Sequence, residues 1–316
     1  MSIGKVLITG ASGMLGLHVV ERFLSMGWEV VSLVNPGSLS RRPWARKVLK
    51  DAEIVEASVI DRDRLRDILS GLDFDVVVHT AAVLGRGRRE MSINYGGTVN
   101  LLDSLKGLGV FVFVSAILAL GDTLRVNASE GAVCRPRTWY ERSKCEAEKV
   151  VMERSRERGW RWVTVRPVWM YGRYTRNPDI PRLLRLARHG VGLVLGRRDL
   201  PLGLVSAEDV ASAIVHLYES GGVGVYNVRG PRIYSAEEFA KALLRAARGS
   251  DSGEMITVPK WILSMGSRFV GALRYVELAP SDVPIDMLSR LGWRPRVDLF
   301  EGLPLVTSWM SDNGLL

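Results

Sequence analysis

The sequence predicts an α/β fold in which a doubly wound parallel sheet is covered by helices on both faces. Two observations support this prediction. Short apolar runs rich in β-formers alternate with helical patterns, and a glycine-rich segment at residues 10–16 joins the first run to the first helix. Parallel pairing is expected because each crossover helix returns the chain to the same edge of the sheet.

The expected elements follow one another along the whole chain. We expect strands at Lys5–Thr9, Glu29–Val34, Glu53–Glu56, Val76–His79, Val110–Ser115, Trp162–Arg166 and Gly224–Val228. We expect helices at Met14–Met26, Met91–Leu105, Tyr140–Arg158, Asp179–His189, Ala207–Glu219, Ala236–Ala247 and Lys260–Leu273. Gly159 suits the end of the longest helix, because glycine adopts the left-handed conformation that often follows a helix.

The alternation becomes less regular after Gly172, which suggests a second domain. We expect residues 1–172 to form a dinucleotide-binding domain, to which residues 204–230 return. Residues 173–203 and 231–316 are expected to form a smaller C-terminal lobe that binds substrate.

Composition narrows the class of protein. Of the 316 residues, 47% are hydrophobic and 24% are charged, which is typical of a globular chain. No apolar run reaches the roughly 20 residues that a membrane-spanning helix needs. The N-terminal apolar stretch is too short for a signal peptide. We therefore expect a cytoplasmic protein without a membrane partner.

Cysteine and histidine usage points to neither a disulfide framework nor a metal site. Cys134 and Cys145 are the only cysteines, which fits a reducing compartment. The four histidines, at positions 18, 79, 189 and 216, show no metal-ligand spacing, so we expect no metal.

The net charge is +9, with a sequence pI of about 9.8. The densest basic stretches are Arg86–Arg89, Arg154–Arg161 and Arg182–Arg198, and none contains a nucleic-acid-binding motif. Solvated helix faces explain most of this charge, and an anionic cofactor or substrate is the alternative. The expected partner is a small molecule rather than a nucleic acid.

The glycine-rich segment TGASGMLG has the features of a Rossmann-type phosphate loop. Gly10 permits a sharp turn, Gly13 lets the backbone approach a pyrophosphate, and Gly16 lets the helix pack closely on the sheet. The helix N-terminus then offers free N–H groups and a partial positive charge to the phosphates. The position between a strand and a helix favours dinucleotide binding over a plain structural turn.

The end of the second expected strand bears on the choice between NAD and NADP. An NAD-selective site usually has an acidic residue here, but this chain has Val34 and Asn35. Arg41 and Arg42 follow, and arginine suits a 2′-phosphate. These residues favour NADP(H) over NAD(H), unless the two arginines are simply solvated loop residues.

Tyr140 and Lys144 are spaced i and i+4, which places them on one face of a helix. A phenol with a pKa of ~10 is a poor base at neutral pH. A neighbouring ammonium group favours the phenolate and lowers that pKa. Tyr140 could then exchange a proton with a substrate alcohol while hydride leaves or reaches its carbon.

With these motifs, the chain resembles the extended short-chain dehydrogenase/reductase family, also called the NAD-dependent epimerase/dehydratase family. The resemblance covers nearly the whole length. The matching segments are TGASGMLG, Tyr140 with Lys144, His79–Ala82, Asn94, Arg166–Gly172, Val205–Ala213, Val225–Gly230 and Leu291–Val297.

The resemblance implies reversible hydride transfer at a secondary alcohol or ketone of a small molecule, as net redox chemistry or as epimerisation. It implies catalytic roles for Tyr140, Lys144 and Ser115. It also implies a homodimer that pairs the helices at 91–105 and 140–158. The implied cofactor contacts are Gly10, Ser12, Gly13, Met14, Leu15, Asn35, Arg41, Ser58, Val59, Thr80, Ala81, Ala82, Tyr140, Lys144, Pro167 and Val168.

The chain departs from the family pattern at the catalytic hydroxyl. The usual Ser/Thr position holds Ala116, and Ser115 precedes it. Because adjacent strand residues face opposite sides, Ser115 replaces that hydroxyl only if the strand end twists or bulges. A non-catalytic NAD(P)-binding sensor or scaffold is therefore the alternative function.

Two further departures concern the substrate. The acidic pair of family dehydratases is replaced by Ile117 and Leu118, so we do not expect dehydration. Nucleotide-sugar members carry Arg-Asp where this chain has Leu202 and Gly203, which weakens a nucleotide-sugar assignment. The apolar segment Pro259–Leu273 resembles dihydroflavonol reductases and 3β-hydroxysteroid dehydrogenases, although ordinary core packing of an amphipathic helix is the better explanation of it. Sugar-type and hydrophobic substrates both stay open.

Overall fold

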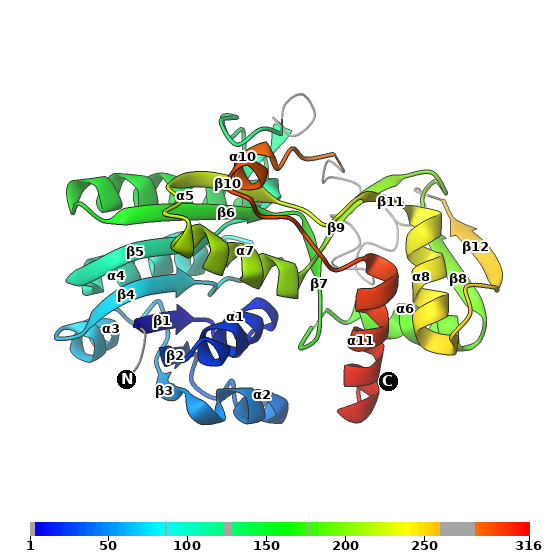
Figure 1. Cartoon of the computed structure of the whole chain (residues 1–316), viewed down its shortest axis with the longest axis horizontal. Helices are drawn as coiled ribbons and strands as arrows, with labels where there is room; N and C mark the ends of the chain where they lie inside the picture. The colour runs from blue at the N-terminus through cyan, green and yellow to red at the C-terminus, as the bar shows by residue number, and fades with distance from the viewer. Residues whose placement is uncertain (1–3, 86, 123–127, 176, 260–281) are drawn as a thin grey trace. The chain divides into compact units, whose positions relative to one another are not determined.

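The computed structural model describes residues 4–85, 87–122, 128–175, 177–259 and 282–316. The chain divides into two compact units (Figure 1). The first comprises Met1–Pro167, Val210–Val228 and Pro284–Trp293, and the second comprises Val168–Asp209, Arg229–Val283 and Arg294–Leu316. The chain returns to the first unit twice, at Val210–Val228 and at Pro284–Trp293, whereas the sequence predicts a single return at 204–230.

The first unit contains a seven-stranded parallel sheet in the order β10-β6-β5-β4-β1-β2-β3. Its strands are β1 (Lys5–Thr9), β2 (Glu29–Val34), β3 (Glu53–Glu56), β4 (Asp73–His79), β5 (Gly107–Val114), β6 (Arg161–Pro167) and β10 (Gly224–Val228). The strand order reverses between β1 and β4, which is the point where such sheets bind ligands at their carboxyl ends. The predicted doubly wound Rossmann-type fold is confirmed.

Helices cover both faces of this sheet (Figure 1). On one face lie α3 (Arg62–Leu69), α4 (Gly97–Ser104) and α5 (Trp139–Glu157), whose buried side chains share a core with β-strand residues such as Leu7 and Phe111. On the other face lie α1 (Met14–Ser25) and α7 (Ala207–Glu219), which are linked by edge-to-face ring contacts of Trp28 with Phe23 and Tyr218. The described residues of this unit also contain the short helices α2 (Pro43–Val48), η1 (Leu49–Asp51), η3 (Ile117–Leu120) and α10 (Asp286–Arg290).

The helix expected at 91–105 forms in two parts. A π-helical turn, η2 (Met91–Gly96), precedes α4, and π-helical turns often occur at functional sites. The helix expected from Tyr140 begins one residue earlier, because Thr138 and Glu141 form a reciprocal capping box at its N-terminus. Gly159 follows this helix with φ of 69°, as its predicted role requires.

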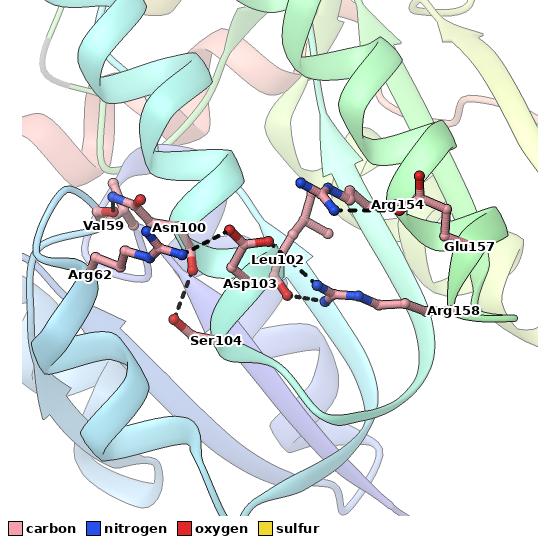
Figure 2. Close-up of polar contacts among 9 residues, drawn as sticks. All are labelled: Val59, Arg62, Asn100, Leu102, Asp103, Ser104, Arg154, Glu157 and Arg158. Carbon is pink, nitrogen blue, oxygen red and sulfur yellow. Dashed lines mark hydrogen bonds and ion pairs between the residues drawn. The ribbon is translucent and has the colours of Figure 1, made fainter.

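Ion pairs account for part of the basic stretch at 154–161 (Figure 2). At the end of α4, Asp103 lies 3.5 Å from Arg62 of α3 and 3.4 Å from Arg158, which follows α5. Arg158 also donates to the carbonyl oxygen of Leu102, one of the carbonyls left without a helical partner at the α4 terminus. These arginines therefore join three helices, and this role requires no external anion.

The described residues of the second unit form two small sheets and three helices. The sheets are β11-β9-β7 and β12-β8, and α6, α8 and α11 pack around one apolar core. Their bounds are β7 (Trp169–Tyr171), β8 (Val191–Leu195), β9 (Pro201–Ser206), β11 (Ile233–Ser235), β12 (Glu254–Val258), α6 (Asp179–Arg188), α8 (Ala236–Arg248) and α11 (Leu299–Asp312). The helix expected at 260–273, and with it the argument for a hydrophobic substrate, lies outside the described residues.

The described residues contain neither a candidate membrane-spanning helix nor a candidate metal cluster. Among them, no helix combines the length and the apolar character that crossing a bilayer requires. Within the same part of the chain, no cluster of three or more His, Cys, Asp or Glu side chains is arranged to hold a metal ion.

Candidate active site

The glycine-rich loop lies between β1 and α1. Gly10 has φ of 67°, and a Cβ there would lie 2.8 Å from the Ala81 backbone. A Cβ on Gly16 would collide with the carbonyl oxygen of Gly10, so the close packing predicted for Gly16 is present. Gly13 is the N-cap of α1, where no side chain caps the helix and no acidic residue occupies the first turn.

This geometry fits the phosphates of a dinucleotide. The first N–H groups of α1, including those of Met14 and Leu15, have no side-chain cap, so they retain hydrogen-bonding capacity for an anion. A Cβ on Gly13 would lie 3.1 Å from the carbonyl oxygen of Gly10. A larger side chain at Gly13 would therefore extend over the loop, where the pyrophosphate is expected.

The structure places Arg42, rather than Arg41, on the phosphate loop. The Arg42 Nη1 atom donates to the Ser12 hydroxyl at 2.8 Å and to the Ser12 carbonyl oxygen. Ser12 in turn donates to the hydroxyl of Ser38 at 3.1 Å. Asn35 and Arg41 are exposed. From the sequence, Arg42 was only the second arginine of a pair that suits a 2′-phosphate. Its contact with Ser12 arises only in the fold, so it was not among the predicted site residues.

The remaining predicted cofactor residues of this unit lie at the carboxyl ends of β3, β4 and β6. Ser58 and Val59 follow β3, and Val59 accepts a hydrogen bond from Asn100 at 3.2 Å. Thr80 donates to the carbonyl oxygen of Thr9 at 2.8 Å. Ala81 and Ala82 follow, with Ala81 half-buried and Ala82 exposed, and Pro167 ends β6. Val168 opens the second unit, so its position relative to these residues is not described.

His79, at the end of β4, is a buried structural residue. Its Nε2 atom lies 3.0 Å from the Thr98 hydroxyl, whose single proton goes to the Asn94 carbonyl oxygen, so Nε2 must be the donor. Nδ1 then accepts from the Thr9 hydroxyl at 2.6 Å. Burial, together with the charge of Lys144, lowers the pKa of His79 to about 3, so the ring is neutral at pH 7.

Tyr140 and Lys144 lie one turn apart near the N-terminus of α5. Tyr140 is half-buried, and Lys144 is 2% exposed. The Lys144 Nζ atom donates to the carbonyl oxygen of Val114, at the end of β5, at 2.8 Å and lies 4.9 Å from the centre of the Phe113 ring. The ammonium is thereby positioned between the helix and the sheet.

Burial lowers the pKa of Lys144 to about 8, against the opposing effect of the Glu148 carboxylate. At pH 7 the group is still mostly protonated, because that pKa lies above 7. A positive charge one helical turn from Tyr140 favours the phenolate form, which is the electrostatic support that the motif predicts. The shift of Lys144 itself is downward because desolvation of the buried ammonium outweighs the attraction of the Glu148 carboxylate.

Asn94, one of the residues that carry the family resemblance, hydrogen-bonds to the helix α5 that contains Tyr140 and Lys144. Its side chain accepts from Val83 N at 2.8 Å and donates to the Val83 carbonyl oxygen at 3.0 Å and to the Ser143 hydroxyl at 2.9 Å. Ser143 donates to the carbonyl oxygen of Tyr140 at 2.8 Å. The π-helical turn that presents Asn94 is therefore connected to the backbone of the Tyr140 turn.

Ser115 does not face open space at the strand end. Its hydroxyl donates to Glu148 Oε1 at 2.5 Å, and it is 3% exposed. Ser115 N bonds to the Val165 carbonyl oxygen at 2.8 Å, and Ala116 is extended, with φ of −156° and ψ of 151°. The strand end is thus regular, without the bulge that would turn Ser115 toward the position of the family hydroxyl.

Glu148 is held by Arg166, and this buried pair was not foreseen as part of the site. Arg166 donates to Glu148 through Nε at 2.9 Å and through Nη2 at 2.6 Å. Both side chains are more than nine-tenths buried. The available sequence signals were the i+4 spacing of Glu148 from Lys144 and the place of Arg166 in the 166–172 motif. The pair joins α5 to β6, while Ser115 connects it to β5.

The residues at the other two departures from the family pattern are apolar or paired through their backbone in the structure. Ile117 is 1% exposed in the short helix η3, where an apolar side chain packs and no acidic group is present. In the second unit, Leu202 is 4% exposed on β9, and Gly203 pairs with Ile233 of β11. Arg197 pairs with Asp199 at 3.0 Å.

Comparison with known proteins identifies the family of the chain. A model of the NAD dependent epimerase/dehydratase family matches residues 6–228. A putative UDP-glucose 4-epimerase of Methanocaldococcus jannaschii is 22% identical over 325 residues, covering 98% of this chain and 99% of that protein.

Solved structures share the fold. A UDP-glucose 4-epimerase from Thermotoga maritima, solved with UDP-glucose, aligns with a TM-score of 0.80 at 23% identity, covering 98% of this chain and 99% of that one. A dTDP-glucose 4,6-dehydratase from Bacillus anthracis, in complex with NAD, aligns with a TM-score of 0.76 at 20% identity, covering 98% and 97%. With the family model matched over more than half of its length, the chain belongs to the NAD dependent epimerase/dehydratase family.

Proposed function

We propose that the protein catalyses reversible hydride transfer at a secondary alcohol or ketone of a sugar-type molecule. Tyr140 acts as the acid/base, and Lys144 supports it electrostatically. The observation that carries the proposal is the buried Lys144 ammonium, held on the Val114 carbonyl oxygen one helical turn from Tyr140. The sugar-type substrate is supported by the UDP-glucose 4-epimerases among the similar proteins.

The proposed mechanism assigns one task to each residue. A bound nicotinamide would supply the acceptor and donor of the hydride. Tyr140 takes the proton of the substrate hydroxyl, or gives it back in the reverse direction. Lys144 stabilises the phenolate that forms on Tyr140 during this exchange. The N-terminus of α1 and the loop around Gly13 would hold the phosphates of the dinucleotide.

Ser115 is not the hydrogen-bond donor to the substrate in this scheme. A hydroxyl has one proton, and that of Ser115 is directed to the Glu148 carboxylate. This contact favours a positioning role, in which Ser115, Glu148 and Arg166 hold α5 against the sheet. It also supports the second candidate, a non-catalytic dinucleotide-binding sensor, because the catalytic hydroxyl of the family has no counterpart at Ala116.

One experiment separates the two candidates. Nucleotide sugars, free sugars and ligands that co-purify with the protein are tested for conversion by NMR and mass spectrometry. Tyr140→Phe should lower turnover by about 10²–10⁴-fold, the usual contribution of a proton-transfer group. Its dinucleotide affinity should stay within about threefold of wild type, since the phenol acts on the substrate. Full turnover in Tyr140→Phe would refute the role of Tyr140 as acid/base, whereas dinucleotide binding without conversion of any of these ligands by the wild-type protein would favour the sensor.

For the cofactor, we propose NADP(H) over NAD(H), although the dehydratase from Bacillus anthracis was solved with NAD. The support is the guanidinium of Arg42 on the phosphate loop and the absence of an acidic residue at Asn35. Arg42→Ala should weaken NADP(H) binding by tenfold or more and change NAD(H) binding by less than threefold, because only NADP(H) carries the 2′-phosphate. Tighter NAD(H) binding by the wild-type protein at both low and high salt would contradict this proposal.

For the reaction outcome, we propose redox chemistry or epimerisation without dehydration. Similar proteins include a dehydratase, but Ile117 and Leu118 provide no carboxyl group for the elimination step. The test is mass spectrometry of the product. Loss of water from a substrate that Tyr140 processes would overturn this part of the proposal.

A further inference from the structure

The chain segment that follows β4 contains one of the three basic stretches of the sequence, Arg86–Arg89. β4 adjoins β1 at the reversal of the strand order, so the chain leaves β4 at the edge where such sheets bind ligands. Arg88 and Arg89 are the arginines of this stretch that the structure describes, and both are exposed. The proposed mechanism uses neither of them, although they follow a strand that ends at the candidate site.

Hydrogen bonds hold the backbone of this segment on both sides of the arginines. Asn94 bonds to the N–H group and to the carbonyl oxygen of Val83, at 2.8 and 3.0 Å. The buried carboxylate of Glu90 accepts from Gly85 N at 2.6 Å. Arg88 lies in the sequence between these bonded residues, so its backbone is held in a defined place.

Arg88 lies over the indole ring of Trp139. Its guanidinium carbon is 5.4 Å from the ring centroid, within the range of a cation–π contact. Trp139 is the first residue of α5, directly precedes Tyr140, and is 40% exposed. Successive helix positions differ by about 100° around the axis, so the ring projects from the same turn as Tyr140 but to one side of it. The Arg88–Trp139 stack therefore places a guanidinium group beside the turn that contains the acid/base.

The positive charge of the stack has no acidic partner in the part of the chain that the structure describes. No ion pair there joins Arg88 or Arg89 to a carboxylate. The acidic residues nearest in sequence, Glu90 and Glu141, are both buried. Glu90 bonds within its own segment, and Glu141 accepts from two backbone N–H groups before α5, at 2.7 and 3.2 Å. The exposed guanidinium groups thus retain hydrogen-bonding capacity for an external anion.

We propose that the Arg88–Trp139 stack binds an anionic group of the substrate, a carboxylate or a phosphate, while Tyr140 acts at the reacting carbon. The inference names a substrate class for the proposed function and rests on that function. A guanidinium group suits both oxyanions, because it can donate two parallel hydrogen bonds to either. The indole face orients the planar group and leaves its N–H edges available to the anion. The net charge of +9 also favours the approach of an anionic substrate.

The test compares sugars that differ in one anionic group. Glucose, glucuronate and glucose 6-phosphate form one set, and UDP-glucose and UDP-glucuronate form the other. Affinities are measured by calorimetry with NADP⁺ or NAD⁺ present, and turnover is followed by NMR. Wild type should bind an anionic member at least tenfold more tightly than the neutral sugar of its set, and high salt should reduce the difference. Preference for glucuronate would identify a carboxylate, and preference for glucose 6-phosphate a phosphate. Equal affinities in both sets, or no binding of any anionic member, would overturn the inference.

Three variants assign the preference to the stack. Arg88→Gln removes the charge from an exposed position, so affinity for the preferred anionic sugar should fall at least tenfold and affinity for the neutral sugar less than threefold. Trp139→Leu should lower the same affinity by about two- to fivefold, the usual value of an exposed cation–π contact. Arg64→Gln removes an equal charge from an exposed position on α3 and should stay within threefold of wild type. Wild-type discrimination in Arg88→Gln would show the inference to be wrong.

These results are separable from the fate of the proposed function. Anion binding that depends on Arg88, without turnover by wild type, would support the anion site and count against hydride transfer. Turnover that requires Tyr140 but is equal for neutral and anionic sugars would support the proposed function and overturn this inference. A changed oligomeric state of Trp139→Leu in light scattering, with unchanged discrimination, would assign the exposed ring to a contact between copies of the chain and would also overturn it.

Discussion

Replacing Lys144 with Met removes a buried ammonium while keeping most of the side-chain volume. Lys144 is 2% exposed, and burial lowers its pKa to about 8 from 10.5. A depressed pKa in a basic group means that the folded state binds the proton less tightly than the unfolded state does. The positive charge of Lys144, which the proposed mechanism needs beside Tyr140, is therefore unfavourable for folding at neutral pH.

The sign and size of the effect follow from proton linkage. Between pH 8 and 10.5 the unfolded chain holds the Lys144 proton more fully than the folded chain, so the free energy of unfolding of wild type rises with pH in this window. One pKa unit corresponds to about 1.4 kcal/mol, so the whole shift is worth about 3 kcal/mol. Lys144→Met lacks this contribution, so its stability relative to wild type should fall by about 3 kcal/mol between pH 7 and 10.5.

The assay is urea unfolding followed by tryptophan fluorescence, at several pH values from 7 to 10.5. Lys149→Met is the control on the same helix. That side chain is 55% exposed, and a hydrogen bond from Lys149 to Glu146 raises its pKa, so its effect should be small and of opposite sign. If the difference between Lys144→Met and wild type stays constant within about 0.5 kcal/mol over this range, the reasoning about Lys144 is wrong.

Three further predictions concern the cluster at the strand end, the phosphate loop and assembly. Ser115→Ala should lower the free energy of unfolding by about 1.5–3 kcal/mol, because it removes a buried hydrogen bond to the Glu148 carboxylate. Its turnover should change less than threefold. A tenfold loss of turnover with unchanged stability would contradict the positioning role. Gly13→Val should weaken dinucleotide binding measured by calorimetry at least tenfold, because its side chain extends over the phosphate loop; unchanged affinity in the folded variant would reject that site. We also expect a homodimer that pairs the helices at 91–105 and 140–158, and light scattering that shows a 35.0 kDa particle across the micromolar range would exclude it.

The sequence alone was sufficient for the features that depend on local chemistry. Strands β1, β2, β3 and β10 have the predicted bounds. For β1 and β2 the reason is that strands buried on both faces need continuous apolar runs. The positive φ of Gly10 and the close packing of Gly16 follow from the absence of a Cβ at those positions. Tyr140 and Lys144 share a helix face because the period of the α-helix dictates it.

The tertiary structure alone decided which side chains are partners. Three bonded pairs each combine residues from different segments of the chain: Ser115 with Glu148, Arg166 with Glu148, and Arg42 with Ser12. Such partnerships depend on the strand order, on the register of β5 against β6 and on the rotation of α5 above the sheet. The same dependence explains the π-helical turn at Asn94, whose side chain bonds to Val83 and Ser143. Local periodicity determines the face on which a residue lies, but only the packed fold determines which groups that face meets.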